Sequence, residues 1–115
     1  MRLRRRADFD KVFRGGRSWN NGLLVLRIVA NDLDHNRYGF VTSKRLGNAV
    51  VRNRTRRRLR EVIRVLPIAT SWDIVISTKR AAAEADFPQL RTAVVQLLQR
   101  AGLLTRPAPV EGATR

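Results

Sequence analysis

The stretch GNAVVRNRTRRRLREVIRVLP, residues 47–67, decides the fold of this chain. At 3.6 residues per turn, its aliphatic side chains fall on one stripe and its arginines on the remaining surface. The stripe consists of Val51, Thr55, Leu59, Val62, Ile63 and Leu66. Asn48 is a typical helix N-cap, and Pro67 cannot continue a helix. The pattern therefore predicts an amphipathic helix over residues 49–66.

The outer surface of this helix carries charge of nearly one sign. Six of the nine residues from Arg52 to Arg60 are arginines, and Glu61 is the only acid of the helix. Like charges four residues apart destabilise a helix by about 0.2–0.5 kcal/mol per pair. Solvated faces usually alternate in sign, so this face predicts a bound polyanion. Asn53 adds an amide, which can read a base edge or a 2′-hydroxyl.

The whole chain shares this charge. It has 115 residues, a formal net charge of +15, and 21 arginines among its 24 basic residues. The planar guanidinium suits phosphate and stacks on bases, so nucleic acid is the first partner expected. An anionic membrane surface and an acidic protein are the alternatives.

The composition also excludes several classes of protein. Without cysteine, the chain cannot form disulfides, zinc–cysteine sites or a thiol nucleophile. No apolar run approaches 18 residues, and the basic N-terminus lacks the apolar middle of a signal peptide. We expect a cytoplasmic protein.

The remaining sequence predicts one small domain. Apolar spacing and turn residues predict helices at 7–14 and 86–101, and strands at 23–29, 37–43 and 72–77. The short polar link between the first two strands predicts that they pair antiparallel. The fold class is α+β, an α/β sandwich of order α-β-β-α-β-α with a small mixed sheet. If the strand–helix–strand unit around the basic helix is parallel, the general rule makes it right-handed.

The domain is expected to span residues 1–104. Residues 1–6 form a mobile basic arm, and residues 105–115 form a disordered tail. No catalytic residue or metal ligand is predicted. His35 is the only histidine, and it lies in the turn DLDHN with no partner spaced for a triad or a metal site.

Two segments resemble one known family. SKRLGNAVVRNRTRRRLRE, residues 43–61, resembles the signature of the protein subunit of bacterial ribonuclease P, a Lys-Lys/Arg-x-Gly-Asn-Ala-Val-x-Arg-Asn-Arg stretch. RLRRRADFDKVFRGG, residues 2–16, is similar to the N-terminal segment of that family, with its Asp-Phe-x-x-Val-Phe helix. The resemblance covers about residues 2–104. It implies an α/β sandwich with a left-handed crossover around the signature helix.

The resemblance also implies a function. In this family a large RNA with bound Mg²⁺ is the catalyst, and it removes the 5′ leader of precursor tRNA. The small protein binds that RNA and the leader, holds no cofactor of its own, and needs no other protein or membrane. The competing interpretations are a free-standing or ribosome-associated RNA-binding protein, an autonomous nuclease and a cationic membrane-surface protein.

Site residues follow from the same resemblance. The contacts to the catalytic RNA are Lys44, Arg45, Gly47, Asn48, Arg52, Asn53, Arg54, Arg56, Arg57 and Arg60. The leader lies in a cleft between the first helix and the sheet, beside Phe9, Phe13 and Arg27. Arg27 stands where relatives often have an aromatic residue. Two alternatives stay open: Asn48 as a helix cap only, and both phenylalanines as pure core.

Overall fold

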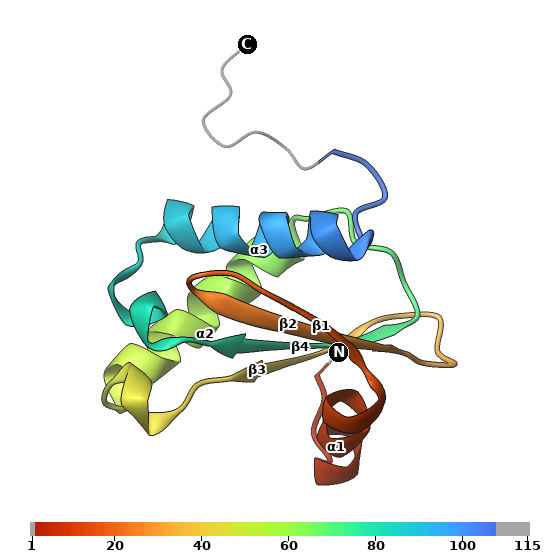
Figure 1. The fold of residues 1–115 in the computed structure, drawn as a ribbon, viewed down its shortest axis with the longest axis horizontal. Coiled ribbons are helices and arrows are strands. Elements are labelled where there is room, and N and C mark those ends of the chain that lie inside the picture. The colour runs from red at the N-terminus through yellow and green to blue at the C-terminus, as the bar shows by residue number, and fades with distance from the viewer. Residues whose placement is uncertain (1, 108–115) are drawn as a thin grey trace.

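A computed structural model describes residues 2–107 of the chain. Its helices and strands are α1 (Arg6–Gly15), β1 (Arg17–Asn20), β2 (Leu24–Ala30), β3 (Arg37–Val41), α2 (Ala49–Arg64), β4 (Trp72–Thr78) and α3 (Phe87–Ala101). Two short 3-10 helices, η1 (Lys44–Leu46) and η2 (Arg80–Glu84), precede α2 and α3. The strands form one sheet of order β1-β2-β4-β3. Helices α2 and α3 cover one face of this sheet and α1 covers the other (Figure 1).

The sheet is mixed, as expected, but its pairing differs from the prediction. β2 pairs antiparallel with β4, and β3 pairs parallel with β4. The predicted antiparallel pairing of residues 23–29 with residues 37–43 is therefore wrong, because β4 lies between these two strands. β4 has buried aliphatic side chains on both faces: Ile74 and Ile76 point to the larger core and Val75 to the smaller one. A strand covered on both faces is best accommodated in the middle of a sheet.

The sequence also gave no sign of β1. Its residues RSWN are mostly exposed and show no alternation of apolar and polar side chains. β1 nevertheless pairs antiparallel with β2, from Arg17 opposite Ile28 to Asn20 opposite Val25. The element order is therefore α-β-β-β-α-β-α.

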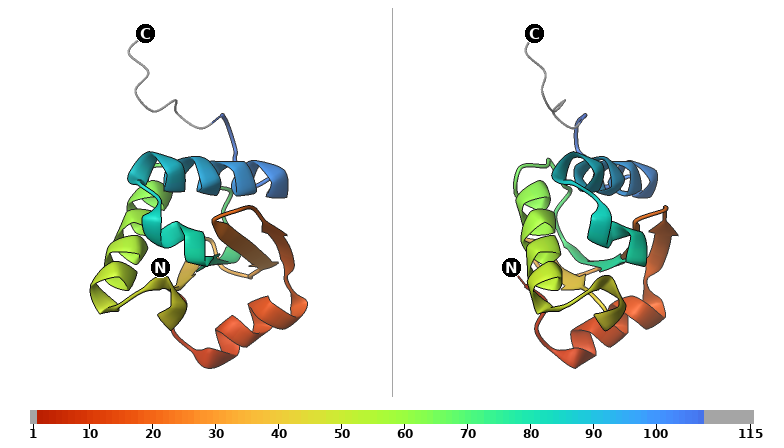
Figure 2. Two further views of the ribbon diagram at one scale, coloured as in Figure 1. Left: turned by 60° about the vertical axis from the view of Figure 1, so that its left-hand side comes forward. Right: turned by 90° about the vertical axis from the view of Figure 1, so that its left-hand side faces the viewer.

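The β3–α2–β4 connection is left-handed. Both strands run from right to left in Figure 1, and α2 lies on the α3 side of the sheet. In the right panel of Figure 2 both strands therefore run toward the reader, and the chain moves from β3 on the left to β4 on the right. This hand agrees with the family resemblance and not with the general rule for parallel crossovers.

The larger core lies between the sheet and helices α2 and α3. Its buried side chains include Leu24, Leu26, Ile28, Leu59, Val62, Ile63, Ile74, Ile76, Leu90, Val94, Leu97 and Leu98. The predicted stripe of α2 is confirmed: all of it is buried except Val51, which is partly buried against this core. A smaller cluster under α1 consists of Leu3, Val12 and Val75, with Phe9, Val29 and Val41 at its margin.

The helix ends follow their sequence signals. Asn48 caps α2 by accepting a hydrogen bond from the backbone N–H of Val51 at 3.1 Å. Asp86 and Gln89 form a capping box at the start of α3, and Gly102 ends α3 in the left-handed conformation with φ 72°. α2 ends at Arg64, two residues earlier than predicted.

The two ends of the domain are attached to it. Leu3 is buried, and its backbone N–H donates to the carbonyl of Tyr38 at 2.9 Å. The expectation of a mobile arm over residues 1–6 is therefore wrong at Leu3, because this side chain completes the smaller core. At the other end, Thr105 donates its backbone N–H to the carbonyl of Pro67 at 2.8 Å. Of the predicted tail, residues 108–115 lie outside the described residues.

Gly39 allows β3 to pack closely under Phe9. A Cβ atom at Gly39 would lie 2.5 Å from Cε1 of the Phe9 ring. We expect Gly39→Ala to lower the free energy of unfolding by about 1–2 kcal/mol, because an added methyl group in a filled core forces side chains off their rotamers. Denaturant unfolding measures this change. Gly22→Ala is the control, since a Cβ atom there meets nothing within 4 Å. Equal stability of the two variants would mean that the Phe9 ring moves aside freely.

Candidate nucleic-acid interface

The arginines of α2 form two rows with different surroundings. Arg52, Arg56 and Arg60, spaced four residues apart, occupy the side of the helix nearest β3. In this row, Arg56 donates from Nη1 to the Thr42 hydroxyl at 2.5 Å. Arg54 and Arg58 occupy the η2 side, and Arg58 donates from Nη1 to the carbonyl of Ala85 at 3.2 Å. Arg58 therefore helps to hold η2, whereas Arg56 is held beside the end of β3.

Asn53 has a role that the sequence did not indicate. Its side-chain oxygen accepts a short hydrogen bond from Nη2 of Arg56. Together, Asn53 and Thr42 hold both terminal nitrogens of the Arg56 guanidinium. The amide nitrogen of Asn53 has no partner within residues 2–107, so it remains able to donate to a base edge or a 2′-hydroxyl. The asparagine of the Arg-Asn-Arg stretch thus positions a neighbouring arginine as well as offering a donor.

Further basic groups surround the start of α2. Lys44 and Arg45 are exposed on η1, directly before the helix. Gly47 has φ 148°, and a Cβ atom there would lie 3.0 Å from Cβ of Val51. Only glycine makes this turn without strain, so Gly47 contributes through the backbone path. The helix N-terminus adds its own positive potential, which favours a bound anion beside Lys44 and Arg45.

The residues predicted for the leader cleft differ in exposure. Phe13 on α1 is 44% exposed. The Cζ atom of Arg27 on β2 lies 4.8 Å from the centroid of the Phe13 ring, an arrangement typical of a cation–π contact. Phe9 is partly buried against the smaller core. The alternative of pure core is therefore wrong for Phe13, while Phe9 mainly supports the packing of β3 against α1.

A third group of side chains was missed at the edge strand β3. Tyr38 and Phe40 point to the α2 side of the sheet, with ring planes 10° apart and centroids 6.5 Å apart. Arg2, Arg4, Arg60 and Arg64 surround them and line a cavity of about 610 Å³. The alternation in Arg37-Tyr38-Gly39-Phe40 could have shown that the two rings share a face. The contact between the N-terminal arm and β3 could not be predicted, because it joins segments that are distant in the sequence.

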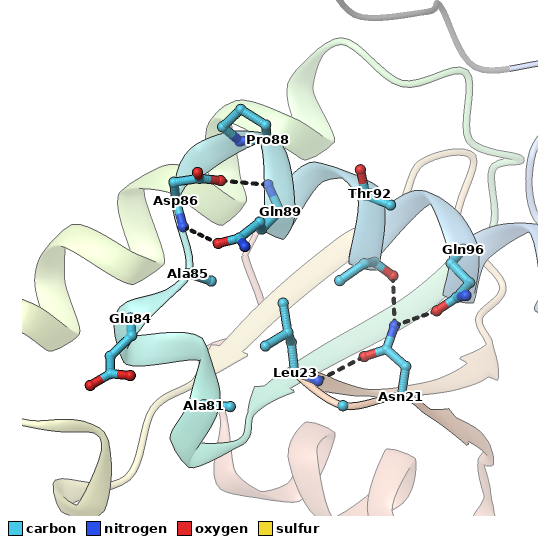
Figure 3. Close-up of a pocket in the computed structure, with 12 residues that line it drawn as sticks. Asn21, Leu23, Ala81, Glu84, Ala85, Asp86, Pro88, Gln89, Thr92 and Gln96 are labelled. Carbon is cyan, nitrogen blue, oxygen red and sulfur yellow. Dashed lines mark hydrogen bonds between the residues drawn. The ribbon is translucent and has the colours of Figure 1, made fainter.

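A second cavity, on the α3 side of the sheet, is a poor RNA site. It measures about 700 Å³ and lies between the turn before β2, η2 and the start of α3 (Figure 3). Its charged lining residues are the acids Glu84 and Asp86, and Asp86 is occupied as the cap of α3. Asn21 spans the cavity edge by donating to the carbonyl of Ala93 at 3.1 Å and to Oε1 of Gln96 at 3.0 Å. Acidic charge and mutually bonded amides do not attract phosphate.

The titratable groups of the described residues offer no candidate metal site. Across residues 2–107, no three histidine, aspartate or glutamate side chains gather as potential metal ligands. His35 pairs with the exposed Asp34 at 2.9 Å, and this hydrogen bond lowers the pKa of Asp34. No helix within the described range is long and apolar enough to cross a membrane.

Comparison with known proteins agrees with the motif resemblance. The family model described as Ribonuclease P matches residues 1–102. A "Ribonuclease P protein component" from Roseiflexus sp. (strain RS-1) is 51% identical over 106 residues, which cover 90% of this chain and 87% of the relative. The chain belongs to the ribonuclease P protein family. Another ribonuclease P protein component, from Chloroflexus aggregans, is 41% identical over 92% of this chain and 81% of its own.

Solved ribonuclease P proteins share the fold. The RNase P protein of Staphylococcus aureus superposes with a TM-score of 0.84 at 31% identity, over 90% of this chain and 97% of that one. The protein from Thermotoga maritima gives a TM-score of 0.77 at 32% identity, over 87% and 96% of the two chains. The α+β class is confirmed, and the chain is placed among protein components that take part in tRNA processing.

Proposed function

We propose that this chain is the subunit of a ribonuclease P holoenzyme that binds the catalytic RNA along α2 and the 5′ leader of precursor tRNA beside α1. The RNA performs the cleavage with its own Mg²⁺, and the protein acts by binding. The observation that carries the proposal is the row Arg52, Arg56 and Arg60, which has no carboxylate within ion-pair distance in the described chain. Such a row on a packed helix neutralises phosphate charge and fixes its orientation.

We assign the catalytic RNA and the leader to different faces of the sheet because the two faces differ in chemistry. The α2 face presents closely spaced guanidinium groups, which suit the dense charge of a structured RNA. The α1 face presents one exposed ring under a guanidinium, which stacks on a base with little regard for its identity. A leader that varies in sequence among precursors would need contacts of this second kind.

Reconstitution tests the proposal. The purified protein is mixed with a bacterial ribonuclease P RNA and precursor tRNA at low Mg²⁺, and 5′ cleavage is scored. We expect little cleavage by the RNA alone, none by the protein alone and efficient cleavage by the mixture, because the protein screens repulsion between the two RNAs. Cleavage by the protein alone would contradict the proposal. A mixture no better than RNA alone would favour a free-standing RNA-binding protein.

Phe13→Ala should lower the affinity of the holoenzyme for tRNA precursors that carry a 5′ leader. Loss of one aromatic stack costs about 1–3 kcal/mol, which is roughly 5- to 150-fold in affinity. Equilibrium binding of precursor tRNA measures the loss. Mature tRNA without a leader should bind the variant and the parent equally. Val65→Ala, which truncates an exposed apolar side chain at the end of α2, is the matched control. Equal losses for both tRNAs would mean that Phe13 does not contact the leader.

A further inference from the structure

The cavity at the edge of β3 combines flat rings with an excess of positive charge. Its floor includes Tyr38 and Phe40, and its rim carries Arg2, Arg4, Arg60 and Arg64. A smaller cavity of about 190 Å³ also borders Arg2, Tyr38, Phe40 and Arg60, and it extends to Arg56. The volume of about 610 Å³ lies within the range of small-molecule sites in proteins.

The rings are fixed in place and face one direction. Both belong to one strand at alternate positions, so they share a face of the sheet. The Tyr38 hydroxyl accepts a hydrogen bond from Nδ2 of Asn36 at 3.1 Å, and Nδ2 also donates to the carbonyl of Ala69 at 2.8 Å. Both rings are only partly buried, and they pack on the larger core at one margin. A prearranged pair of nearly parallel rings offers a stacking surface without further ordering.

The charges around the rings repel one another. Glu61 pairs with Arg64 at 2.8 Å, but no carboxylate of the described chain pairs with Arg2, Arg4 or Arg60. Partial desolvation and the nearby charges of Arg2 and Arg56 lower the pKa of Arg60. An anion bound at the rim would relieve this repulsion, so the cavity is suited to a ligand with negative charge.

Only some anions would use both parts of the cavity. A free phosphate or a lipid headgroup would meet the arginines and leave the rings without a partner. A nucleotide would place its phosphate at the guanidinium groups and its base on the rings, where each base stack is worth about 1–3 kcal/mol. Paired bases are held inside a duplex, so the base must be unpaired.

The location of the cavity indicates which of the two RNAs, the catalytic RNA or the leader, supplies the nucleotide. Arg60 belongs both to its rim and to the row that we propose binds the catalytic RNA. Phe13 and Arg27, proposed for the leader, contact each other, and Phe13 belongs to α1, which covers the opposite face of the sheet (Figure 1). We infer that this cavity, which we term the Tyr38–Phe40 pocket, receives one unpaired nucleotide of the RNA that lies along α2, with its base on Tyr38 and Phe40 and its phosphate on Arg2 or Arg60. This inference rests on the proposed function and adds a specific contact to it.

The test compares a double change on edge strand β3 with a single change on the other edge strand, β1. Tyr38→Leu with Phe40→Leu removes both rings but keeps apolar side chains against the core. Trp19→Leu is the matched control, because Trp19 is a partly exposed ring on the other edge strand with Arg17 at 5.1 Å from its centroid. Affinity for bacterial ribonuclease P RNA is measured over a range of salt concentrations. We expect the double variant to lose roughly 5- to 150-fold in affinity with an unchanged salt slope, since no phosphate contact is lost. The control should lose less than about twofold.

The outcomes separate the inference from the proposed function. If the parent protein does not bind the RNA, the proposed function fails. If the parent and the double variant bind the RNA equally well, the proposed function is supported, but the inference that the Tyr38–Phe40 pocket receives a nucleotide is wrong. If the double variant melts well below the parent, a second experiment on the parent protein tests the inference. A mixed-sequence pool of RNA hexamers is added, and the ring-proton NMR signals of Tyr38 and Phe40 should shift upfield. Shifts confined to arginine signals would overturn the inference.

Discussion

Replacing Asp73 by asparagine should destabilise the domain by about 3 kcal/mol, a large share of the stability of a small protein. Asp73 is fully buried on the central strand β4. Its carboxylate accepts hydrogen bonds from Nε and Nη2 of Arg37 at 2.8 and 2.6 Å, and from Nδ2 of Asn31 at 2.9 Å. Arg37 also reaches Asp8 of α1 at 3.4 Å. Asparagine would leave the guanidinium half-buried without its main counter-charge.

The same pair predicts how stability depends on pH. Burial alone would raise the pKa of the Asp73 carboxyl, but hydrogen bonds from Arg37 and Asn31 outweigh burial and lower it. A carboxyl whose pKa is lowered in the folded state contributes stability above its unfolded pKa of about 3.9, and this contribution is lost as the pH falls through the folded pKa. Asp73→Asn should therefore lose stability at neutral pH and lose less on acidification than the parent.

Thermal and denaturant unfolding at pH 7 and pH 3 measure both effects. Asp32→Asn is the control, because Asp32 is an exposed turn residue and no ion pair of the described chain includes it. A cost below about 1 kcal/mol for Asp73→Asn would mean that Arg37 swings into solvent and leaves little charge buried.

Local signals were enough for the helices and not for the sheet. The stripe of α2 and the Asn48 cap depend on neighbours three or four residues apart, and both were predicted. Strand pairing depends on contacts between distant segments. A six-residue polar link favoured a hairpin between β2 and β3, but β4 with its run of Ile74, Val75 and Ile76 needs cover on both faces and inserts between them.

The candidate RNA-binding site also has parts that local sequence patterns could predict and parts that they could not. The arginine face of α2 could be predicted, since one helix carries all of it. Helical spacing also predicted that Arg52, Arg56 and Arg60 form a row apart from Arg58. The contacts of Arg58 to Ala85 and of Arg56 to Thr42 could not be predicted, because they join segments that are distant in the sequence. Similarly, the pairing of Phe13 with Arg27 and the Tyr38–Phe40 pocket arise where segments far apart in sequence meet.

The arginine row itself should control RNA affinity. We expect the triple variant Arg52→Gln, Arg56→Gln and Arg60→Gln to lose roughly a hundredfold in affinity for ribonuclease P RNA at about 0.15 M salt, because each lost phosphate contact removes just under one unit from the slope of log K against log salt. The slope should fall by about two to three units. Filter binding over a salt series measures both quantities, and low-Mg²⁺ cleavage should fall in parallel.

The free energy of unfolding of this triple variant should rise or stay constant, although its affinity for RNA falls. Like charges at four-residue spacing cost about 0.2–0.5 kcal/mol per pair, and the triple variant removes such pairs while it loses the hydrogen bond from Arg56 to Thr42. The matched control is Arg91→Gln, Arg100→Gln and Arg106→Gln on and after α3, which lowers the net charge equally, from +15 to +12. Equal loss of affinity in both triple variants would show that the chain attracts RNA by total charge alone. A much larger loss for the α2 variant, with unchanged melting, would show that the spacing and rigidity of this row determine how the RNA is held.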